Sequence, residues 1–410
     1  MTIDSTSTTP ADTAPFFPAP RTCPFSVPDG YTEFREKGGL QKVTIWDGST
    51  QWLATGYDET RAVLASPSFS ADVRNENFPL SFANQRVEQA GLLLRLDDPQ
   101  HAKQRRMLTK EFSVKNVEAL KPRLAEITDE LIDAMLEKGS PVDFVESFAL
   151  PLPSQAICMI LGVPYEDREI FQRHADSSTD LDTTHDVRVA MQMEAFQYYM
   201  SLVESKKRNP GDDLISRLLT NHMGPDGFQL EELPALVFLL VAGGHDTTAK
   251  MLGLSVMALL NNPEQRDRLR ADPSLAPSAA EELLRYWGVV STDPRRVATE
   301  DVEIGGQLVR AGEGIVVSLV AANRDPKSFG PDADELDLSR GARNHFAFGF
   351  GTHQCLGQNL ARAELQVALP RIFERIPDLR LAVPHDQLDF TQNSIVFGAR
   401  KLPVAWGAAQ

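Results

Sequence analysis

Cys355 is the side chain with the clearest chemical context in this sequence, because it lies in a glycine-rich turn. Gly349 and Gly351 precede it, Gly357 follows it, and an amphipathic helix pattern begins directly afterwards. Glycine permits a backbone with positive φ, so several N–H groups can point at one sulfur. Together with the positive end of the helix dipole, these groups favour a thiolate over a thiol. A lone cysteine is usually a small core residue, whereas a thiolate held in this way is a metal ligand or a nucleophile.

The fixed positions of this turn are Phe348, Gly349, Gly351, His353, Cys355 and Gly357. Their spacing resembles, without a gap, the haem-binding signature of the cytochrome P-450 superfamily. The resemblance implies that Cys355 is the axial thiolate of a haem iron, a ligand that pushes electron density onto the metal and favours O–O cleavage. It also implies haem b as the cofactor and places Phe348 and Gly349 in the cofactor-binding loop.

A second unusual stretch, residues 242–248, lies inside a long apolar helix pattern at about residues 230–260. Two adjacent glycines within a helix cost roughly 1 kcal/mol each relative to alanine, and a nearby threonine can bond back to the preceding turn. The stretch indicates either tight helix packing or a local widening that admits a small ligand. It is similar to the oxygen-binding motif of the superfamily. By that resemblance Thr247 steadies dioxygen and Asp246 delivers protons, as general acid chemistry requires.

Four residues match the partners of the haem propionates in the superfamily: His101, Arg105, Arg296 and His353. His101 and Arg105 are four positions apart in a predicted helix and therefore share one face, which alone would also suit a solvated basic face. Arginine forks suit carboxylates, and of two adjacent arginines Arg296 is the one that aligns.

Glu282 and Arg285 form a Glu-x-x-Arg pair. Such pairs are common on helix surfaces and contribute only tenths of a kcal/mol. The pair lies in sequence between the oxygen-binding motif and the cysteine turn, and in this position it resembles the structural Glu-x-x-Arg pair of the superfamily. That pair ties its helix to the segment before the cysteine. The third member would be Arg340, with Arg343 as the alternative.

Composition limits the class of protein. The chain has 410 residues, 42% hydrophobic residues and a formal net charge of −16, which argues against general nucleic-acid binding. The three cysteines, Cys23, Cys158 and Cys355, are far apart and indicate no disulfide framework. We find neither an apolar run long enough to span a membrane nor a secretory signal. We therefore expect a cytoplasmic protein that does not associate with a membrane.

The resemblance covers about residues 24–406 and implies the triangular cytochrome P-450 fold, which is mainly α with small β-sheets. We predict a mobile N-terminal tail over residues 1–20 and a single haem-thiolate monooxygenase domain over residues 21–410. Alternating residues around Asp47-Gly48 predict a hairpin. Pro370, inside the helix that follows Cys355, predicts a bend or an early end of that helix.

The implied reaction is insertion of one oxygen atom from O2 into a small hydrophobic substrate, in secondary metabolism or xenobiotic conversion. We expect a monomer that receives electrons from a separate ferredoxin and ferredoxin reductase, because no flavin or iron–sulfur segment follows the haem domain. Lys103, Arg106 and Lys110 would form a basic docking patch on an otherwise acidic protein.

The predicted pocket residues lie near the haem in the superfamily, and most are apolar, which suits a hydrophobic molecule. They are Phe78, Leu92, Leu94, Leu239, Gly243, Val290, Ser291, Thr292 and Ile395. Each fits an ordinary core position equally well. His174 and His185 could be ligands, although surface histidines are commoner.

Two alternatives stay open. One is a haem-thiolate enzyme that uses peroxide or couples phenols, against which Asp246 and Thr247 weigh. The other is a non-catalytic haem protein that acts as a sensor or recruits a partner. Turnover with a redox partner and NAD(P)H distinguishes the three.

Overall fold

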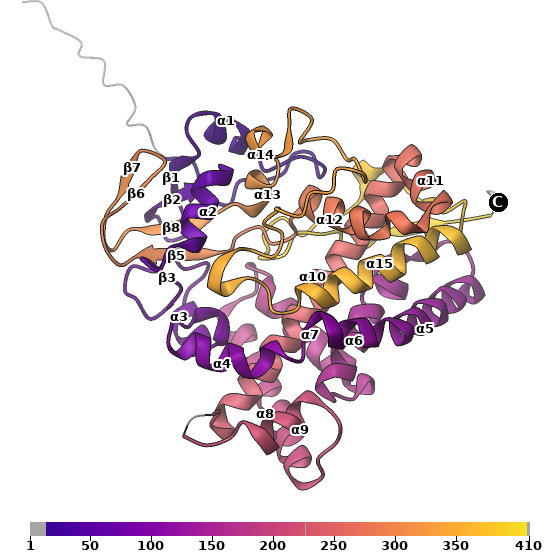
Figure 1. The fold of residues 1–410 in the computed structure, drawn as a ribbon, viewed down its shortest axis with the longest axis horizontal. Helices are drawn as coiled ribbons and strands as arrows, with labels where there is room; N and C mark the ends of the chain where they lie inside the picture. The colour runs from indigo at the N-terminus through magenta and orange to yellow at the C-terminus, as the bar shows by residue number, and fades with distance from the viewer. Residues whose placement is uncertain (1–13, 226, 408–410) are drawn as a thin grey trace, which may run out of the picture.

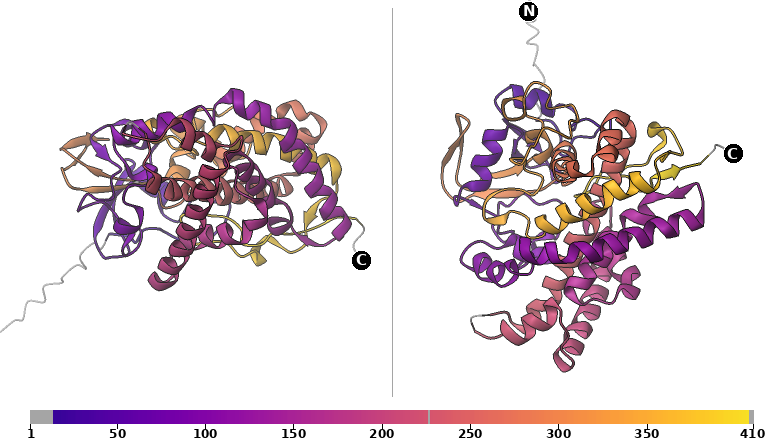
Figure 2. Two further views of the ribbon diagram at one scale, coloured as in Figure 1. Left: turned by 90° about the horizontal axis from the view of Figure 1, so that it is seen from below. Right: turned by 45° about the vertical axis from the view of Figure 1, so that its right-hand side comes forward.

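Helix α10 (Leu233–Asn261) runs through the interior, and the rest of the chain is arranged around it. The computed structural model describes residues 14–225 and 227–407. The outline is roughly triangular, with strands β1–β3 and β5–β8 gathered on one side and most helices filling the other, where the small sheet β4-β10-β9 also lies (Figures 1 and 2). The architecture is thus mainly helical with small sheets, which confirms the fold class expected from the sequence.

The remaining helices are α1 (Tyr31–Glu36), α2 (Tyr57–Ala65), α3 (Gln85–Gln89), α4 (Gln100–Thr109), α5 (Val114–Lys138), α6 (Pro151–Leu161), α7 (Arg168–Thr179), α8 (His185–Arg208), α9 (Leu214–Asn221), α11 (Pro263–Ala271), α12 (Ala276–Trp287), α13 (Leu319–Ala322), α14 (Pro326–Phe329) and α15 (Gln358–Arg375). The strands are β1 (Leu40–Thr44), β2 (Thr50–Ala54), β3 (Phe69–Ser70), β4 (Val142–Asp143), β5 (Arg295–Ala298), β6 (Val302–Ile304), β7 (Gln307–Val309), β8 (Gly314–Val317), β9 (Arg380–Leu381) and β10 (Pro403–Ala405).

The largest sheet has the strand order β1-β2-β8-β5-β3. Strands β1 and β2 form the predicted antiparallel hairpin, in which Leu40 pairs with Ala54, and Gly48 at its turn has φ of +81°. Strand β8 runs parallel to β2 and antiparallel to β5. This sheet brings β5, and with it Arg296, to the edge of the helical portion.

Each half of α10 belongs to a different large apolar cluster. The C-terminal half of α10 packs with α12 and α15 around residues such as Leu252 and Leu369. The N-terminal half packs with α6, α8 and α9 around residues such as Val237 and Leu218. Because α10 is hydrophobic almost all round, it is suited to burial on every side.

Two expectations from the sequence require correction. The chain is not a free tail up to residue 20: Phe17 is 1% exposed, and its N–H donates to the Thr44 carbonyl at 2.8 Å. Residues 1–13 lie outside the described part. Of the two outcomes expected at Pro370, the early end of the helix is wrong, because α15 continues to Arg375, whereas the bend stays a prediction. A proline removes one backbone donor, and the packing of Leu369 and Ile372 in the core holds the turns on both sides of Pro370.

Among the residues that the structure describes, no helix combines the length and the apolar character needed to cross a membrane.

Candidate haem-thiolate site

The turn that carries Cys355 is shaped by two glycines with left-handed backbones. Gly349 has φ of +67° and Gly351 has φ of +73°. At Gly351 a side chain is excluded twice, because an added Cβ would lie 2.3 Å from the Leu64 carbonyl oxygen of α2. The Cys355 N–H donates to the Phe348 carbonyl at 2.8 Å, and α15 begins three residues later. The turn therefore fixes the sulfur at the N-terminal end of α15.

The pKa of the Cys355 thiol is raised, chiefly because protein atoms surround it. The backbone N–H groups of Gly357 and Gln358 and the charges of Arg105 and Arg362 act in the opposite direction. The backbone N–H groups thus favour the thiolate, as predicted, but the effect of burial is larger. A bound cation would reverse the balance, because a coordinating thiol loses its proton. The side chain also keeps accessible surface, as expected if it faces an enclosed space.

The four residues predicted to hold the propionates come together beside this turn. The rings of His101 and His353 lie 4.1 Å apart, and Arg105 donates to the Gln354 carbonyl. The pKa of His353 is lowered to about 2, first by burial and then by the charges of Arg296, His101 and Arg105. Arg296 is buried, and its own pKa is lowered to about 10 by that burial. These groups form a positive cluster drawn from α4, β5 and the cysteine turn.

This cluster is short of negative charge. His101 lies 3.3 Å from Asp98. Neither Arg105 nor Arg296, however, has a carboxylate within 4.0 Å among the described residues. Buried charges are normally paired, so two buried or half-buried guanidinium groups without an acid fit a ligand that brings its own carboxylates.

Three glycines, two in the cysteine turn and one on α10, are not covered by packed protein atoms. A Cβ added at Gly349 or Gly357 would meet no atom within 4 Å, and the same holds for Gly243 on α10. A thiol ligand, two unpaired arginines and glycine-lined space together fit haem. Cys355 would ligate the metal, and Arg105 and Arg296 would receive the propionates.

On α10, Leu239, Gly243 and Thr247 are spaced four apart and therefore share one face. The Thr247 hydroxyl donates to the Gly243 carbonyl at 2.6 Å, which is the predicted bond back to the preceding turn. Both Gly243 and Thr247 keep accessible surface. This accessible face is therefore the part of α10 that could border a ligand.

Asp246 and His245 are buried on the other side of α10. His245 lies 2.5 Å from the Ser154 hydroxyl. The Asp246 carboxyl is 2% exposed, and its Oδ1 has no hydrogen-bond partner among the described residues. Burial raises the pKa of Asp246, while Lys250 and Thr179 act to lower it. A carboxyl group that resists ionisation next to Thr247 is suited to passing on protons.

The predicted pocket residues are only partly brought together. Ser291 donates from its N–H to the Ile395 carbonyl at 2.9 Å, which places residues 290–291 beside residue 395. Leu94 and Val290 are half-buried. Phe78 instead packs in a small core with Val73 and Val297.

Thr292 is fully buried, and its carbonyl accepts from Arg295. It therefore resembles Phe78 in having no open space at its side chain. Phe78 and Thr292 are therefore ordinary core residues, the alternative that the sequence had left open for every predicted pocket position.

Two pockets lie away from Cys355. One, of about 350 Å³, is lined by Leu92, by Val189 and Phe196 of α8, and by Pro234 and Phe238 of α10.

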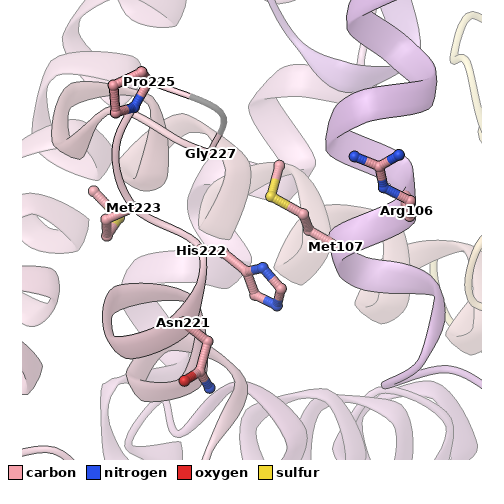
Figure 3. Close-up of a pocket in the computed structure, with 7 residues that line it drawn as sticks. All are labelled: Arg106, Met107, Asn221, His222, Met223, Pro225 and Gly227. Carbon is pink, nitrogen blue, oxygen red and sulfur yellow. The ribbon is translucent and has the colours of Figure 1, made fainter.

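The other pocket, of about 440 Å³, lies between α4, at Arg106 and Met107, and the C-terminal end of α9, at Asn221 and the following residues His222 and Met223 (Figure 3). It includes one member of the predicted docking patch. Lys103 of the same patch donates to the Pro225 carbonyl at 3.1 Å, and Arg106 and Lys110 are exposed.

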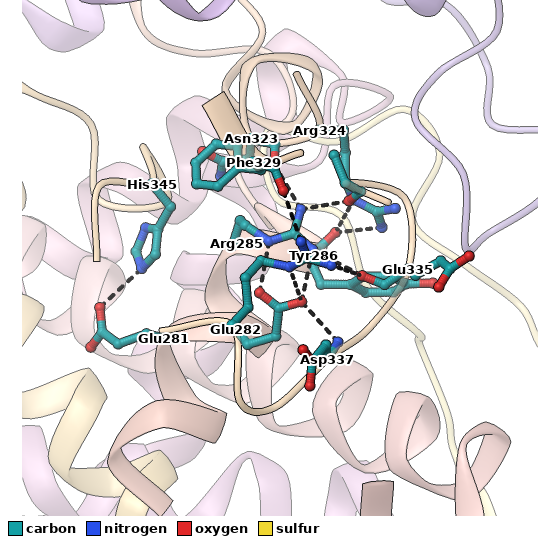
Figure 4. Close-up of polar contacts among 12 residues, drawn as sticks. Glu281, Glu282, Arg285, Tyr286, Asn323, Arg324, Phe329, Glu335, Asp337 and His345 are labelled. Carbon is teal, nitrogen blue, oxygen red and sulfur yellow. Dashed lines mark hydrogen bonds and ion pairs between the residues drawn. The ribbon is translucent and has the colours of Figure 1, made fainter. Parts of the chain in front are cut away.

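The Glu-x-x-Arg pair is a buried junction rather than a surface pair (Figure 4). Arg285 donates two hydrogen bonds to Glu282, at 2.7 and 2.8 Å, and both side chains are fully buried. Arg340 Nε lies 3.2 Å from the same carboxylate, and the Asp337 N–H lies 3.0 Å from it. Arg343 is exposed. The third position of the network is thus filled by Arg340.

Sequence reasoning missed two arginines near the site. Arg95 contributes to lowering the pKa of both Arg296 and His353, and it pairs with Asp293 at 3.0 Å. Arg362 of α15 pairs with Glu281 at 2.6 Å. Neither arginine belongs to a motif of fixed spacing, so no pattern in the sequence identified Arg95 or Arg362.

The two histidines left open as ligands differ. His185 is exposed, whereas His174 is buried, contrary to the expected surface position. Within the described residues no group of three or more His, Cys, Asp and Glu side chains could hold a metal ion.

A thiol at a helix N-terminus, two arginines without a carboxylate partner and an accessible glycine–threonine face on α10 fit a haem-thiolate enzyme, and comparison with known proteins identifies the family. The Cytochrome P450 family model matches residues 171–399. Cytochrome P450-SU2 of Streptomyces griseolus is 44% identical over 407 residues, which is 99% of this chain and 100% of the relative. Vitamin D3 dihydroxylase of Streptomyces griseolus is 42% identical over 410 residues, covering 98% and 100%.

Among solved structures, the mycinamicin VIII C21 methyl hydroxylase of Micromonospora griseorubida, bound to mycinamicin VIII, has a TM-score of 0.91 at 39% identity. It covers 96% of this chain and 100% of that chain. The chain belongs to the cytochrome P450 family. It is a haem-thiolate monooxygenase with haem as its cofactor.

Proposed function

We propose that this single-domain enzyme hydroxylates an extended lipophilic molecule of natural-product type in the cytoplasm, with haem b as the bound group. The observation that carries the proposal is the combination of Cys355 with two arginines, Arg105 and Arg296, that lack a carboxylate partner among the described residues. Haem supplies the activation of dioxygen, and the chain's own groups position the substrate and manage protons.

Relatives support the substrate class. Two relatives are named for the hydroxylation of organic molecules, a vitamin D3 dihydroxylase and a mycinamicin VIII C21 methyl hydroxylase. In this chain, Leu239 on α10 and Val290 and Ile395 from two other segments would present apolar surface to such a molecule. Burial of this surface would exclude water from the reacting carbon.

The roles of the polar groups follow from their positions. Thr247 would hold dioxygen through its hydroxyl, which now donates to Gly243. Asp246 would hold the proton that reduction of oxygen consumes, because its burial favours the protonated carboxyl. His101 and His353 would remain neutral hydrogen-bonding groups beside the propionates, since burial lowers the pKa of each.

Electrons would come from a ferredoxin and its reductase. The support is the exposed cationic surface of α4, formed by Arg106 and Lys110, on the helix whose Arg105 contacts the cysteine turn. A peroxide-driven reaction is the second candidate. It would need neither these cations nor Asp246.

The test is the absorption spectrum of the reduced protein with carbon monoxide. We expect the strongly red-shifted Soret band of thiolate-ligated haem. Cys355→Ala should abolish it, and Cys23→Ala, at an exposed cysteine, should leave it unchanged. A band at the position typical of histidine-ligated haem in the wild type would overturn the proposal. Product formation with ferredoxin, reductase and NAD(P)H but not with peroxide would then separate the two candidates.

A further inference from the structure

Arg362, on α15, is a cation beside the cysteine turn that none of the roles above uses. Its guanidinium group forms a fork with the Glu281 carboxylate of α12: Nε lies 2.6 Å from Oε1, and Nη2 lies 3.2 Å from Oε2. The side chain of Glu281 is 9% exposed and that of Arg362 is 22% exposed. A largely buried carboxylate fixes a guanidinium fork in one orientation, so Arg362 is held in place beside the turn.

His345 contacts the same carboxylate from the segment that leads into the turn (Figure 4). Its Nδ1 accepts from the Ala347 N–H at 3.1 Å, so the ring hydrogen is on Nε2. Nε2 lies 3.2 Å from Glu281 Oε2 and is therefore the donor to it. Because a ring with hydrogen on both nitrogens could not accept, His345 is neutral in this arrangement. Glu281 thus joins α12 and α15 to the segment before the cysteine, and Arg362 alone balances its charge within this network.

Arg362 also contacts the residues that hold Cys355 on both sides. Before the cysteine, its guanidinium carbon lies 4.5 Å from the centre of the Phe348 ring, within the range of cation–π attraction. The Phe348 carbonyl in turn accepts from the Cys355 N–H at 2.8 Å. After the cysteine, Arg362 Nη1 lies 2.9 Å from Gln358 Oε1, and the Gln358 N–H is one of the groups that favour the Cys355 thiolate. The place of the sulfur is therefore tied to Arg362 through both neighbours.

We propose that Arg362 is a positioning residue for the metal ligand: it fixes the two segments that hold Cys355, and its charge, balanced by Glu281, sets the field at the sulfur. This inference rests on the proposed role of Cys355 as the haem ligand. Reduction of the bound metal adds a negative charge to the site, so a nearby cation favours the reduced state and a nearby anion disfavours it. In agreement with this geometry, the charge of Arg362 acts to lower the pKa of the Cys355 thiol.

The first test is the reduction potential of the haem-loaded protein, measured by spectroscopic redox titration. Arg362→Met should lower the potential, because it removes the cation and leaves the charge of Glu281 unbalanced. Glu281→Gln should raise the potential, because it removes the anion and leaves the cation. A role confined to packing would not give shifts of opposite sign, since both variants break the same ion pair. Shifts in one direction, or no shift, would overturn the proposal.

A matched control pair lies on the same helix. Arg371 of α15 is 3.6 Å from Asp129 of α5, and the two side chains are 38% and 42% exposed. Arg371→Met and Asp129→Asn make the same changes in net charge as the first pair of variants. They should leave the potential unchanged, because solvent and salt screen exposed charges. If they shift it as much as the first pair does, net charge sets the potential and the proposal fails.

Arg362→Lys separates charge from position, and it keeps the test decisive if Glu281→Gln does not fold. Lysine retains the charge but lacks the planar fork. The potential should therefore stay nearer to that of the wild type than in Arg362→Met, and equal potentials in the two variants would overturn the role of the charge. On warming, both variants should lose the red-shifted carbon monoxide band at a lower temperature than the wild type. A band as resistant to heat as that of the wild type would overturn the positioning role.

The carbon monoxide spectrum of the wild type separates this inference from the proposed function. If the wild type lacks the red-shifted band, Cys355 is not the ligand and both proposals fail. If the band is present and the potentials do not respond as expected, the inference about Arg362 fails alone.

Discussion

At the scale of single residues, the cysteine turn depends on glycines for different reasons, and this difference can be measured. Gly351 combines φ of +73° with a contact at which a Cβ would lie 2.3 Å from the Leu64 carbonyl. Gly349 has φ of +67° but open space, and Gly357 has φ of −82° and open space. We expect Gly351→Ala to lower the free energy of unfolding by about 2–4 kcal/mol, because strain and overpacking add.

Gly349→Ala should cost about 1 kcal/mol, from its left-handed backbone alone. Gly357→Ala is the matched control and should change stability by less than about 0.5 kcal/mol. Urea denaturation of the haem-free proteins gives the three values. Equal losses at Gly349 and Gly351 would show that the contact with α2 does not hold the turn.

A second prediction at the residue scale concerns His245 and the pH dependence of the free energy of unfolding. It is 1% exposed, and burial lowers its pKa to about 4. An unfolded histidine binds a proton near pH 6.5, so between pH 6.5 and 4 the unfolded state binds more protons and stability falls as pH falls. Between pH 7 and 4 the wild type should lose about 3 kcal/mol more than His245→Gln.

Unfolding in urea at several pH values measures this difference. His185→Gln, at an exposed histidine of α8, is the control and should follow the wild type. Parallel curves for wild type and His245→Gln would mean that His245 can take up a proton without unfolding.

At the scale of elements, the buried junction of Glu282 decides how α12 is joined to the segment before the cysteine. The side chains of Arg285 and Glu282 are both fully buried, so removal of one leaves an unpaired buried charge. We expect Arg285→Met to cost about 3–5 kcal/mol. Arg340→Met should cost about 1–3 kcal/mol, because Arg340 is 11% exposed and adds a charged hydrogen bond at 3.2 Å.

Arg343→Met is the control, since Arg343 is exposed and lies three residues after Arg340. It should leave the urea midpoint unchanged. A loss at Arg343 equal to that at Arg340 would assign the stabilisation to general charge rather than to the contact with Glu282.

The elements also show what can be read from a sequence. The β1–β2 hairpin, α4 and α10 are predictable because turn residues, periodicity and motifs are local. Pro370 misleads because its cost is local, whereas the packing that offsets it comes from α12 and the C-terminal segment.

The same limit applies to the site. Cys355, His101 and Arg105 belong to motifs with fixed spacing, so they could be named. Arg95 and Arg362 pair with acids that are distant in the chain, Asp293 and Glu281. Positions of this kind become visible only when the fold brings them together.

At the scale of the whole molecule, charge is unevenly distributed. The formal net charge is −16, yet α4 exposes Arg106 and Lys110. An acidic partner would be repelled by the molecule as a whole and attracted at α4, so the orientation in which it binds is set by this surface. The pocket beside Arg106 adds His222 to the same region (Figure 3).

The consequence is a prediction about rate rather than about substrate. Arg106→Glu should slow reduction by an acidic ferredoxin about tenfold at low salt, because steering depends on local charge, and should leave the spectral binding of substrate unchanged. The difference from wild type should shrink as salt rises and screening shortens the range of the field. Stopped-flow reduction at several salt concentrations measures both. Arg208→Glu, at an exposed arginine that ends α8, carries the same change in net charge. If it slows reduction as much as Arg106→Glu does, net charge controls the encounter and α4 is not the docking surface.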